Sequence, residues 1–159
     1  DDGYGSASMW GTPTADAFII GGAGNEVNES STDYVAYCWH SVDGFSKFGK
    51  YVGNGSASDG PFIYTGFKPA LVIIKGYTIG TSWYMFDNKR NPFNPSGKRL
   101  VADGTYADDA GTTEALDFLS NGFKLRNTSS GTNGAYTYMF YAWAEHPFVG
   151  DGVNPVTAR

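Results

Sequence analysis

The sequence has little of what catalytic and cross-linked proteins usually depend on. It contains one cysteine, Cys38, so no internal disulfide can form. Its two histidines, His40 and His146, are not spaced as a local metal pair, and a zinc site would need further ligands from distant strands. No Gly-x-Ser-x-Gly motif occurs, and no helical pattern follows the glycine cluster at residues 21–24. The sequence therefore predicts no cofactor, no metal site and no enzyme.

Long apolar runs and basic charge are also scarce. No run of about 18 apolar residues occurs, which predicts no transmembrane helix. The net charge of -5 and the pI of about 4.8 argue against nucleic acid as a partner, because nucleic-acid binding needs a basic stripe. The acids gather in residues 1–33 and the bases in residues 34–100, which predicts either solvated loops or head-to-tail contact between copies.

What the sequence does contain is glycine and aromatic residues. The chain has 159 residues, a size typical of one domain, with 22 glycines and 16% aromatic residues. Ala, Leu, Glu, Lys and Arg, which an extended helix needs, are uncommon. No repeat with a period of 20–50 residues is found, which disfavours a propeller or a β-helix. This composition predicts an all-β protein with many tight turns.

Alternating or continuous apolar runs predict roughly eight to ten strands separated by turn residues. That spacing is typical of a single antiparallel β-sandwich of the jelly-roll or lectin-like type. The predicted strands are residues 16–20, 34–40, 46–52, 62–67, 69–77, 82–87, 100–102, 115–119, 123–126 and 135–146.

Two hairpins stand out in this pattern. Residues 34–40 and 46–52 alternate on either side of a Val-Asp-Gly turn, which predicts a central aromatic hairpin with Cys38 buried as a small apolar group. Asn121-Gly122 lies between two apolar runs and predicts a primed turn with positive φ at both residues.

The run at residues 69–77 is the most continuously apolar segment and predicts a central strand that is buried on both faces. The predicted core contains four consecutive residues of this strand and three from later strands. These residues are Leu71, Val72, Ile73, Ile74, Phe118, Leu125 and Phe140.

The two ends of the chain differ from its centre. Residues 1–14 predict an extended leader, residues 15–148 the sandwich, and residues 149–159 an extended tail. Met9 and Trp10 are the apolar residues able to anchor the leader, and we expect at least one terminus to pack on another copy. The alternative is that both termini fold back on their own domain.

Several stretches resemble an uncharacterised domain of the tail and fibre proteins of tailed phages, often found beside lectin-like modules. They are YVAYCWHSVDGFSKFG from residue 34, GNG from 53, YTGFKPA from 64, WYMFDNKRNP from 83, FLSNGFKLR from 118 and YAWAEHPF from 141. Together they cover about residues 34–148. The resemblance implies a structural or adhesive role on an extracellular particle, and it implies no catalytic residues.

A glycan site is predicted where aromatic and polar residues adjoin. Exposed aromatic rings beside planar polar groups bind sugars through stacking and hydrogen bonds, and a loop held by its own Asp and Arg is the alternative interpretation. The candidate residues are Trp83, Tyr84, Asp87, Asn88, Lys89 and Arg90.

Four carboxylates, Asp87, Glu114, Asp117 and Glu145, would have to meet in pairs for glycoside hydrolysis. Three Asn-x-Ser/Thr sequences, at Asn28, Asn54 and Asn127, match the glycosylation pattern and fall in predicted loops.

These observations favour a non-enzymatic structural or adhesive subunit of an extracellular fibre, such as a phage tail fibre, that assembles from copies of itself. Cell-surface polysaccharide is a second expected partner. The alternatives are a monomeric carbohydrate-binding module and a glycosidase-like enzyme. The molecular mass in solution separates a fibre subunit from a monomeric module.

Overall fold

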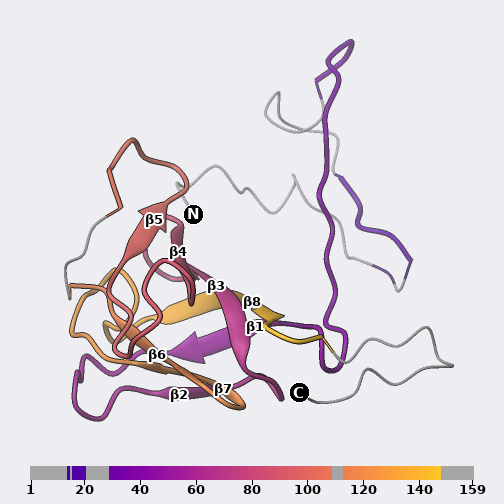
Figure 1. Ribbon diagram of the computed structural model, residues 1–159. Coiled ribbons are helices and arrows are strands. Elements are labelled where there is room, and N and C mark those ends of the chain that lie inside the picture. Colours follow the sequence, from indigo (N-terminus) through magenta and orange to yellow (C-terminus); the bar gives the residue numbers. More distant parts are fainter. Residues whose placement is uncertain (1–13, 15, 21–28, 109–112, 148–159) are drawn as a thin grey trace, which may run out of the picture. The chain divides into compact units, whose positions relative to one another are not determined.

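The computed structural model describes residues 14, 16–20, 29–108 and 113–147 (Figure 1). The chain divides into two compact units, Asp1–Trp39 and His40–Arg159, and each is described by itself. The described part of the second unit forms eight strands in two antiparallel sheets and contains no helix. The predicted all-β sandwich is confirmed. Among the described residues no helix is long and apolar enough to cross a membrane.

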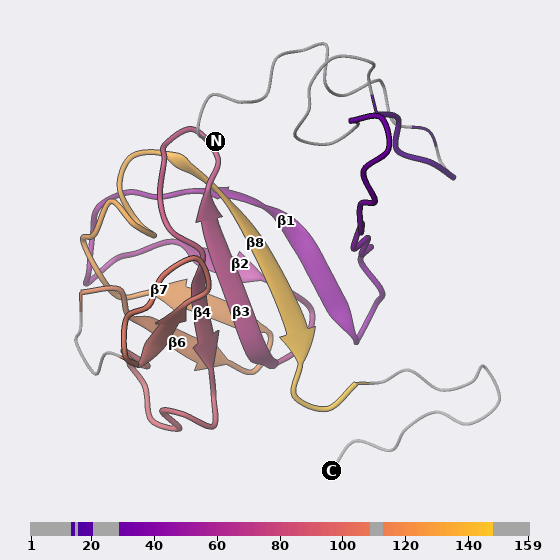
Figure 2. The same cartoon turned by 90° about the horizontal axis from the view of Figure 1, so that it is seen from above.

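The larger sheet has five strands in the order β1-β8-β3-β4-β5, and Figure 2 shows β1, β8, β3 and β4 side by side. Its central strands, β8 and β3, are also its longest, which agrees with the continuous apolar and alternating patterns of those segments. The strands are β1 (Ser46–Val52), β3 (Pro69–Gly76), β4 (Tyr84–Asp87), β5 (Arg99–Val101) and β8 (Thr137–Ala144).

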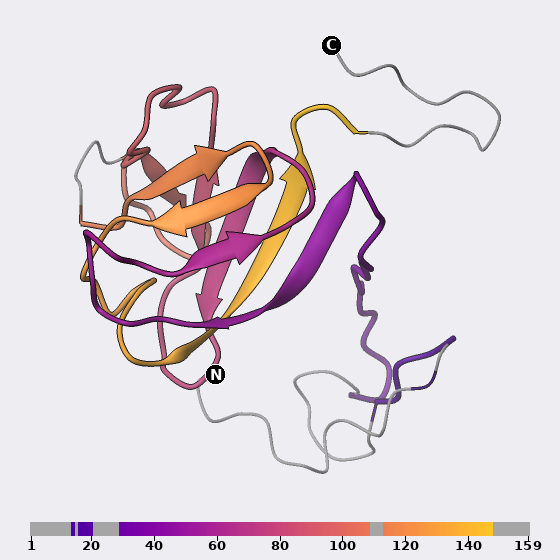
Figure 3. The ribbon, with the colours of Figure 1, turned by 90° about the horizontal axis from the view of Figure 1, so that it is seen from below.

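The smaller sheet has three strands in the order β2-β7-β6, and Figure 3 shows these strands running across those of the larger sheet. Its strands are β2 (Phe62–Tyr64), β6 (Leu116–Leu119) and β7 (Gly122–Leu125). β6 and β7 form the hairpin that the sequence predicts, with Phe118 opposite Phe123. β2 pairs with the other edge of β7.

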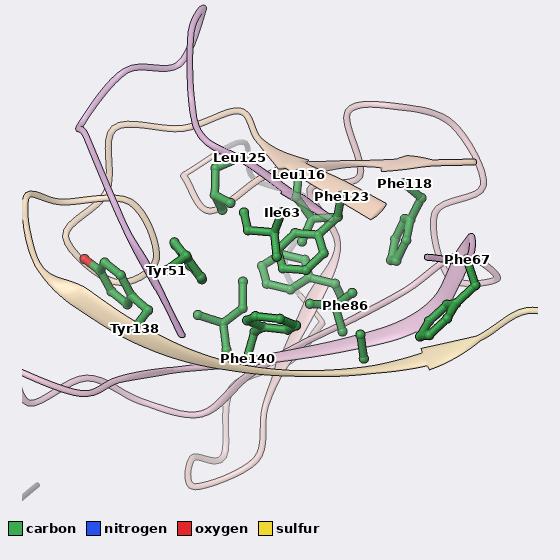
Figure 4. Packing of buried hydrophobic residues seen from close by; sticks show 13 residues of the cluster. Tyr51, Ile63, Phe67, Phe86, Leu116, Phe118, Phe123, Leu125, Tyr138 and Phe140 are labelled. Atoms are coloured by element: carbon green, nitrogen blue, oxygen red, sulfur yellow. The ribbon is translucent and has the colours of Figure 1, made fainter. Parts of the chain in front are cut away.

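The core lies between the two sheets (Figure 4). We call the side of the five-stranded sheet that faces the smaller sheet its inner face. From the inner face, Phe140 of β8 points toward Phe123 of β7, and Tyr138 of β8 stacks on Tyr51 of β1. The ring centroids of Phe123 and Phe140 are 5.6 Å apart in an edge-to-face arrangement, which is a favoured geometry for aromatic pairs.

The prediction that β3 is buried on both faces is half wrong. Val72 and Ile74 are fully buried on the inner face, whereas Leu71 and Ile73 point the other way and are half-buried. β3 is central within its sheet, but only one face of that sheet is covered by the second sheet. The other three predicted core residues, Phe118, Leu125 and Phe140, are buried.

The predicted central hairpin is wrong in its first arm. Residues 34–40 form neither helix nor strand, and every one of them is exposed, Cys38 included. The turn itself is as predicted, with Gly44 at a φ of 71° and a bridge between Val42 and Ser46. β1 pairs with β8, about ninety residues further along the chain, rather than with residues 34–40. Residues 16–20, predicted as a strand, also belong to no named strand.

The predicted primed turn at Asn121-Gly122 is wrong as well. The two-residue loop of the hairpin is Ser120-Asn121, because Leu119 pairs directly with Gly122. Neither Asn121 nor Gly122 has positive φ. Gly122 is instead the buried first residue of β7, and a Cβ atom there would overlap the carbonyl oxygen of Ile63 in β2. The glycine is required by close approach of two strands rather than by turn geometry.

Candidate functional site

The candidate glycan cluster at residues 83–90 lies along β4 and the turn that follows it. Trp83 precedes β4 and packs on Tyr141 with 5.8 Å between ring centroids. Tyr84, one residue later, contacts the guanidinium of Arg99, which lies 5.5 Å from the ring centroid. Since neighbouring side chains on a strand point to opposite faces, the two rings do not form one stacking platform.

Asp87 and Arg90 are engaged with each other. The carboxylate of Asp87 accepts hydrogen bonds from the backbone N–H of Lys89 and of Arg90, at 3.1 and 2.6 Å, and from Nε of Arg90 at 3.0 Å. Burial raises the pKa of Asp87, but these hydrogen bonds outweigh that effect and lower the pKa below its ordinary value. The loop is therefore held by its own Asp and Arg side chains, which is the interpretation that the sequence allowed as the alternative to a glycan site.

The side chain of Asn88, which lies between Asp87 and Arg90 in the sequence, is not held in this way. It is 8% exposed, and its side-chain Nδ2 and Oδ1 have no hydrogen-bond partner among the described residues. It lines a cavity of about 290 Å³ with Lys68, Lys89, Pro92, Asn94, Phe118 and Glu145. A buried amide without partners calls for a water or a ligand that supplies them. The cavity therefore offers one donor and one acceptor beside three charged side chains.

The charges at the mouth of this cavity, which we call the Asn88 cavity, belong to one ion-pair network. Glu145 accepts from Nζ of Lys68 at 2.7 Å and of Lys89 at 3.4 Å. The hydrogen bond from Lys68 is the main cause of the lowered pKa of Glu145, and burial opposes it. Asn94 also lines the cavity, but its amide is occupied, donating to the carbonyl of Phe118 and accepting from its N–H at 2.9 Å each.

A second cavity, of about 440 Å³, opens at the β4–β5 edge of the large sheet. Arg99 and Tyr84 line it, and Arg99 forms an ion pair with the buried Glu114 at 2.7 Å. Burial raises the pKa of Tyr84, and the charge of Glu114 adds to that shift. Glu114 also accepts from the hydroxyl of Ser129 at 2.7 Å. The ion pair and the hydrogen bond thus join Arg99, Glu114 and Ser129 at this edge.

The side of the five-stranded sheet that points away from the core, its outer face, is apolar. The strand register places five apolar side chains in one row across all five strands, and each of them is half-buried. We call this set the apolar row; it consists of Phe48, Tyr141, Ile73, Met85 and Leu100, from β1, β8, β3, β4 and β5 in turn.

Aromatic rings extend the apolar row. Phe48 contacts Tyr141 and Trp143 edge-to-face, with ring centroids 5.6 and 5.5 Å apart. Trp83 joins from the other side through Tyr141, and the ammonium of Lys75 lies 5.9 Å from the centroid of the Trp83 ring. An antiparallel sheet with one face in water normally carries polar residues on that face. This outer face instead carries the apolar row through its middle, with Lys50 and Lys75 beside it.

The four candidate catalytic carboxylates do not form a pair with one another. Each is matched with its own base: Asp87 with Arg90 at 3.0 Å, Glu114 with Arg99 at 2.7 Å, Asp117 with Arg126 at 2.7 Å and Glu145 with Lys68 at 2.7 Å. Charged partners at this distance stabilise the ionised form of a carboxylate.

His40 and His146 are exposed, and the Nδ1 atom of His40 contacts the carbonyl of Ser41 at 3.1 Å. Among the described residues, no group of three or more His, Cys, Asp or Glu side chains is placed to hold a metal ion. Met9 and Trp10, the candidate assembly contacts of the leader, lie outside the described residues.

The sequence did not indicate that one of its glycosylation patterns is buried. Asn127 is 3% exposed, and its Nδ2 donates to the carbonyl of Ala115 at 2.9 Å. Its Oδ1 accepts from the N–H of Ser129 and the hydroxyl of Thr132. A glycan on Nδ2 would break this network, so Asn127 is a structural residue. Asn54 is exposed, and Asn28 lies outside the described residues.

Comparison with known proteins gives one informative match. A family model described as "Domain of unknown function (DUF7483)" matches residues 2–147. No curated protein and no solved structure matches the chain.

Proposed function

We propose that this chain, which belongs to the DUF7483 family, is a non-enzymatic structural subunit of an extracellular fibre, of the kind found in phage tails, and that copies associate through the outer face of the five-stranded sheet. The apolar row carries this proposal. Five apolar side chains in register across five strands form a continuous surface on the side away from the core. Contiguous apolar surface that is only half-buried in the single chain marks an interaction site.

The occupant of the outer face is a second copy of this chain. A fibre requires repeated contacts between identical subunits, and contact between this face and a second copy supplies one of them. The face has the features of an interface core, because Tyr, Trp, Phe and Met are enriched there. Lys50 and Lys75 flank the row and supply the polar rim.

The pairing of each candidate carboxylate with its own base supports the non-enzymatic part of the proposal. Glycoside hydrolysis needs one carboxyl group that stays protonated and a second that acts as nucleophile or base. The lowered pKa values of Asp87 and Glu145 keep these two carboxyl groups ionised and unsuited to donate a proton.

The molar mass of the full chain in solution, measured by light scattering over a range of concentrations, tests the proposal. We expect an oligomer for the native chain and a monomer for Phe48→Lys, because lysine on an edge strand is compatible with folding but opposes apolar contact. Tyr64→Lys is the matched control, since Tyr64 is 63% exposed on the smaller sheet and lies outside the apolar row. A native chain that is monomeric at high concentration contradicts the proposal.

The Asn88 cavity favours a second candidate function, which is glycan binding. The free donor and acceptor of Asn88, together with Lys68, Lys89 and Glu145, suit neighbouring hydroxyl groups of a sugar. Phe118 and Pro92 supply apolar surface for the ring. This arrangement matches the usual small-ligand site, which is mostly apolar with a few oriented polar groups.

Asn88→Leu separates a binding role from a structural one. Replacing an amide that lacks hydrogen bonds by an apolar side chain of similar size leaves stability unchanged or raises it. We therefore expect the variant to keep its melting temperature and to lose binding on a glycan array. Arg90→Ala is the control, because Arg90 is held by Asp87 and Asp108 and should leave binding intact. Binding that survives Asn88→Leu excludes this cavity.

A further inference from the structure

Part of the sequence occurs twice. Residues 14–40 contain, in the same order, three patterns that recur about 100 residues later. The patterns are Phe-Ile/Leu-x-x-Gly at residues 18–22 and 118–122, Asn-x-Ser-Ser at 28–31 and 127–130, and Tyr-x-x-Tyr-x-Trp at 34–39 and 138–143. This period is longer than the 20–50 residues typical of solenoid and propeller repeats. The repeat therefore has the scale of a domain.

In the second unit, the three patterns hold key positions of the sandwich. Phe118 lies in the core on β6, and Gly122 permits the close approach of β7 to β2. Asn127 anchors the turn at residues 129–133, and the Tyr-x-x-Tyr-x-Trp pattern is β8, which lies between β1 and β3. Each pattern thus contributes to the folding of one sandwich.

Each unit has a turn closed by a backbone hydrogen bond ahead of its aromatic segment, but the two turns are offset by one residue in the alignment of the Asn-x-Ser-Ser pattern. In the second unit, the N–H of Thr132 donates to the carbonyl of Ser129 at 3.3 Å. In the first unit, the N–H of Thr32 donates to the carbonyl of Glu29 at 3.3 Å. In both units an alternating aromatic segment follows this turn, and it begins with tyrosine.

Burial differs sharply between the two copies. Phe18 is 45% exposed, whereas its counterpart Phe118 is 7% exposed. Val35 and Tyr37 are 78% and 76% exposed, whereas the β8 residues that correspond to them are half-buried. The small Ala36 and Cys38 correspond to the inner-face residues Phe140 and Ala142. A segment with strand-like alternation and this much exposed aromatic surface has the character of an interaction site.

The sheet of the second unit cannot accept residues 34–40 at the position of β8. β8 already pairs with β1 on one side, through seven residue pairs from Ser46↔Trp143 to Val52↔Thr137, and with β3 on the other side. Counterparts of β6 and β8 are present in residues 14–40, but counterparts of β1 and β3 are not.

We propose that residues 14–40 are the last strands of a second sandwich of the same type. Residues 34–40 bind as a β8-like strand between strands equivalent to β1 and β3, which an incomplete sandwich of this family presents. Tyr34, Ala36 and Cys38 then face its core, and Val35, Tyr37 and Trp39 extend its outer face. Addition of a strand to a sheet gains the backbone hydrogen bonds of both edges as well as apolar contact. The inference does not depend on the proposed fibre role.

The missing strands are available from this chain itself, which gives a direct test. A second copy of residues 40–113, joined ahead of residue 14 in place of residues 1–13, supplies counterparts of β1 to β5 to residues 14–40. Hydrogen–deuterium exchange is then measured on the native and the extended chain. We expect the amides of residues 34–40 to exchange at least about 100-fold more slowly in the extended chain, because they become part of a folded sheet.

Two matched substitutions in the extended chain test the predicted register. Cys38→Asp places a charge on the face that corresponds to Ala142 in the core, and we expect it to abolish the protection of residues 34–40. Val35→Asp places the same charge on the outer face, and we expect the protection to remain. Equal exchange of residues 34–40 in the native and extended chains, while β8 stays protected, overturns the proposal. Equal effects of the two substitutions overturn it as well.

Discussion

At the scale of single residues, Gly122 shows how one position joins two strands. A Cβ atom there would overlap the carbonyl oxygen of Ile63 and lie 2.9 Å from Cε2 of the Phe62 ring. We expect Gly122→Ala to lower the free energy of unfolding by about 1–3 kcal/mol, the usual cost of overpacking. Gly80→Ala is the control, because a Cβ at Gly80 meets nothing within 4 Å and should change stability little. Urea unfolding of both variants gives the comparison.

Glu145 gives a pH-dependent contribution to stability. Its pKa is lowered in the folded state, chiefly by the hydrogen bond from Lys68, so it stabilises the fold above its unfolded value near 4.5 and loses this effect as the pH falls through the folded value. We expect Glu145→Gln to cost at most about 1 kcal/mol at neutral pH, since Lys68 is 49% exposed. Urea unfolding at neutral and acidic pH should show the difference vanish in acid.

The control for this substitution is Asp59→Asn. Asp59 faces Lys124 at 3.6 Å, but its side chain is 95% exposed, so water screens the pair. The control should unfold like the native protein at both pH values. A Glu145→Gln effect that persists unchanged in acid would assign the loss to packing rather than to charge.

At the scale of the elements, β3 separates the two faces of the larger sheet. Ile74 is fully buried on the inner face, whereas its neighbour Ile73 is half-buried in the apolar row. We expect Ile74→Ala to lower the free energy of unfolding by about 2–5 kcal/mol and Ile73→Ala to cost less than half of that. The two variants remove the same atoms, so a difference between them in thermal unfolding reports how deeply each isoleucine is buried. Equal losses would mean that the outer face is covered in solution, as the proposed association requires at high concentration.

The sequence predicted which segments form strands better than it predicted which strands pair with each other. Alternation on β8 and the apolar run of β3 identified those strands, because the period of a strand is a local property, but the run of β3 did not show that only one of its faces is covered. The same criterion made residues 34–40 a strand of a local hairpin, but β1 pairs with β8 from the far end of the chain. Pairing depends on long-range contacts that a local pattern does not contain.

The candidate glycan cluster shows the same limit at a smaller scale. Residue types at positions 83–90 suggested one site, but the strand places Trp83 and Tyr84 on opposite faces, and the turn joins Asp87 to Arg90. The feature that marks Asn88, a buried amide with no partner within the described part of the chain, arises only when Lys68, Phe118 and Glu145 meet around it. Nothing in the local sequence could indicate that cavity.

At the scale of the whole molecule, two surfaces compete as the origin of self-association. The sequence assigned assembly to at least one terminus, with Met9 and Trp10 as the contacts of the leader, whereas the structure presents a continuous apolar row on the larger sheet. The two assignments predict different behaviour when the N-terminal part is removed. Association through the apolar row does not need residues 1–39, because its five side chains all belong to the second unit.

We therefore expect chains that lack residues 1–14 or residues 1–39 to form particles with the same number of subunits as the full chain, as judged from the molar mass in light scattering. Phe48→Lys in the full chain should be monomeric, although its leader is intact, because a desolvated ammonium opposes the apolar contact. If loss of residues 1–14 alone gives a monomer while Phe48→Lys still associates, the leader carries the assembly. Removal of residues 1–39 should also leave the melting temperature of the sandwich unchanged, since β8 already fills the place between β1 and β3 that residues 34–40 would need.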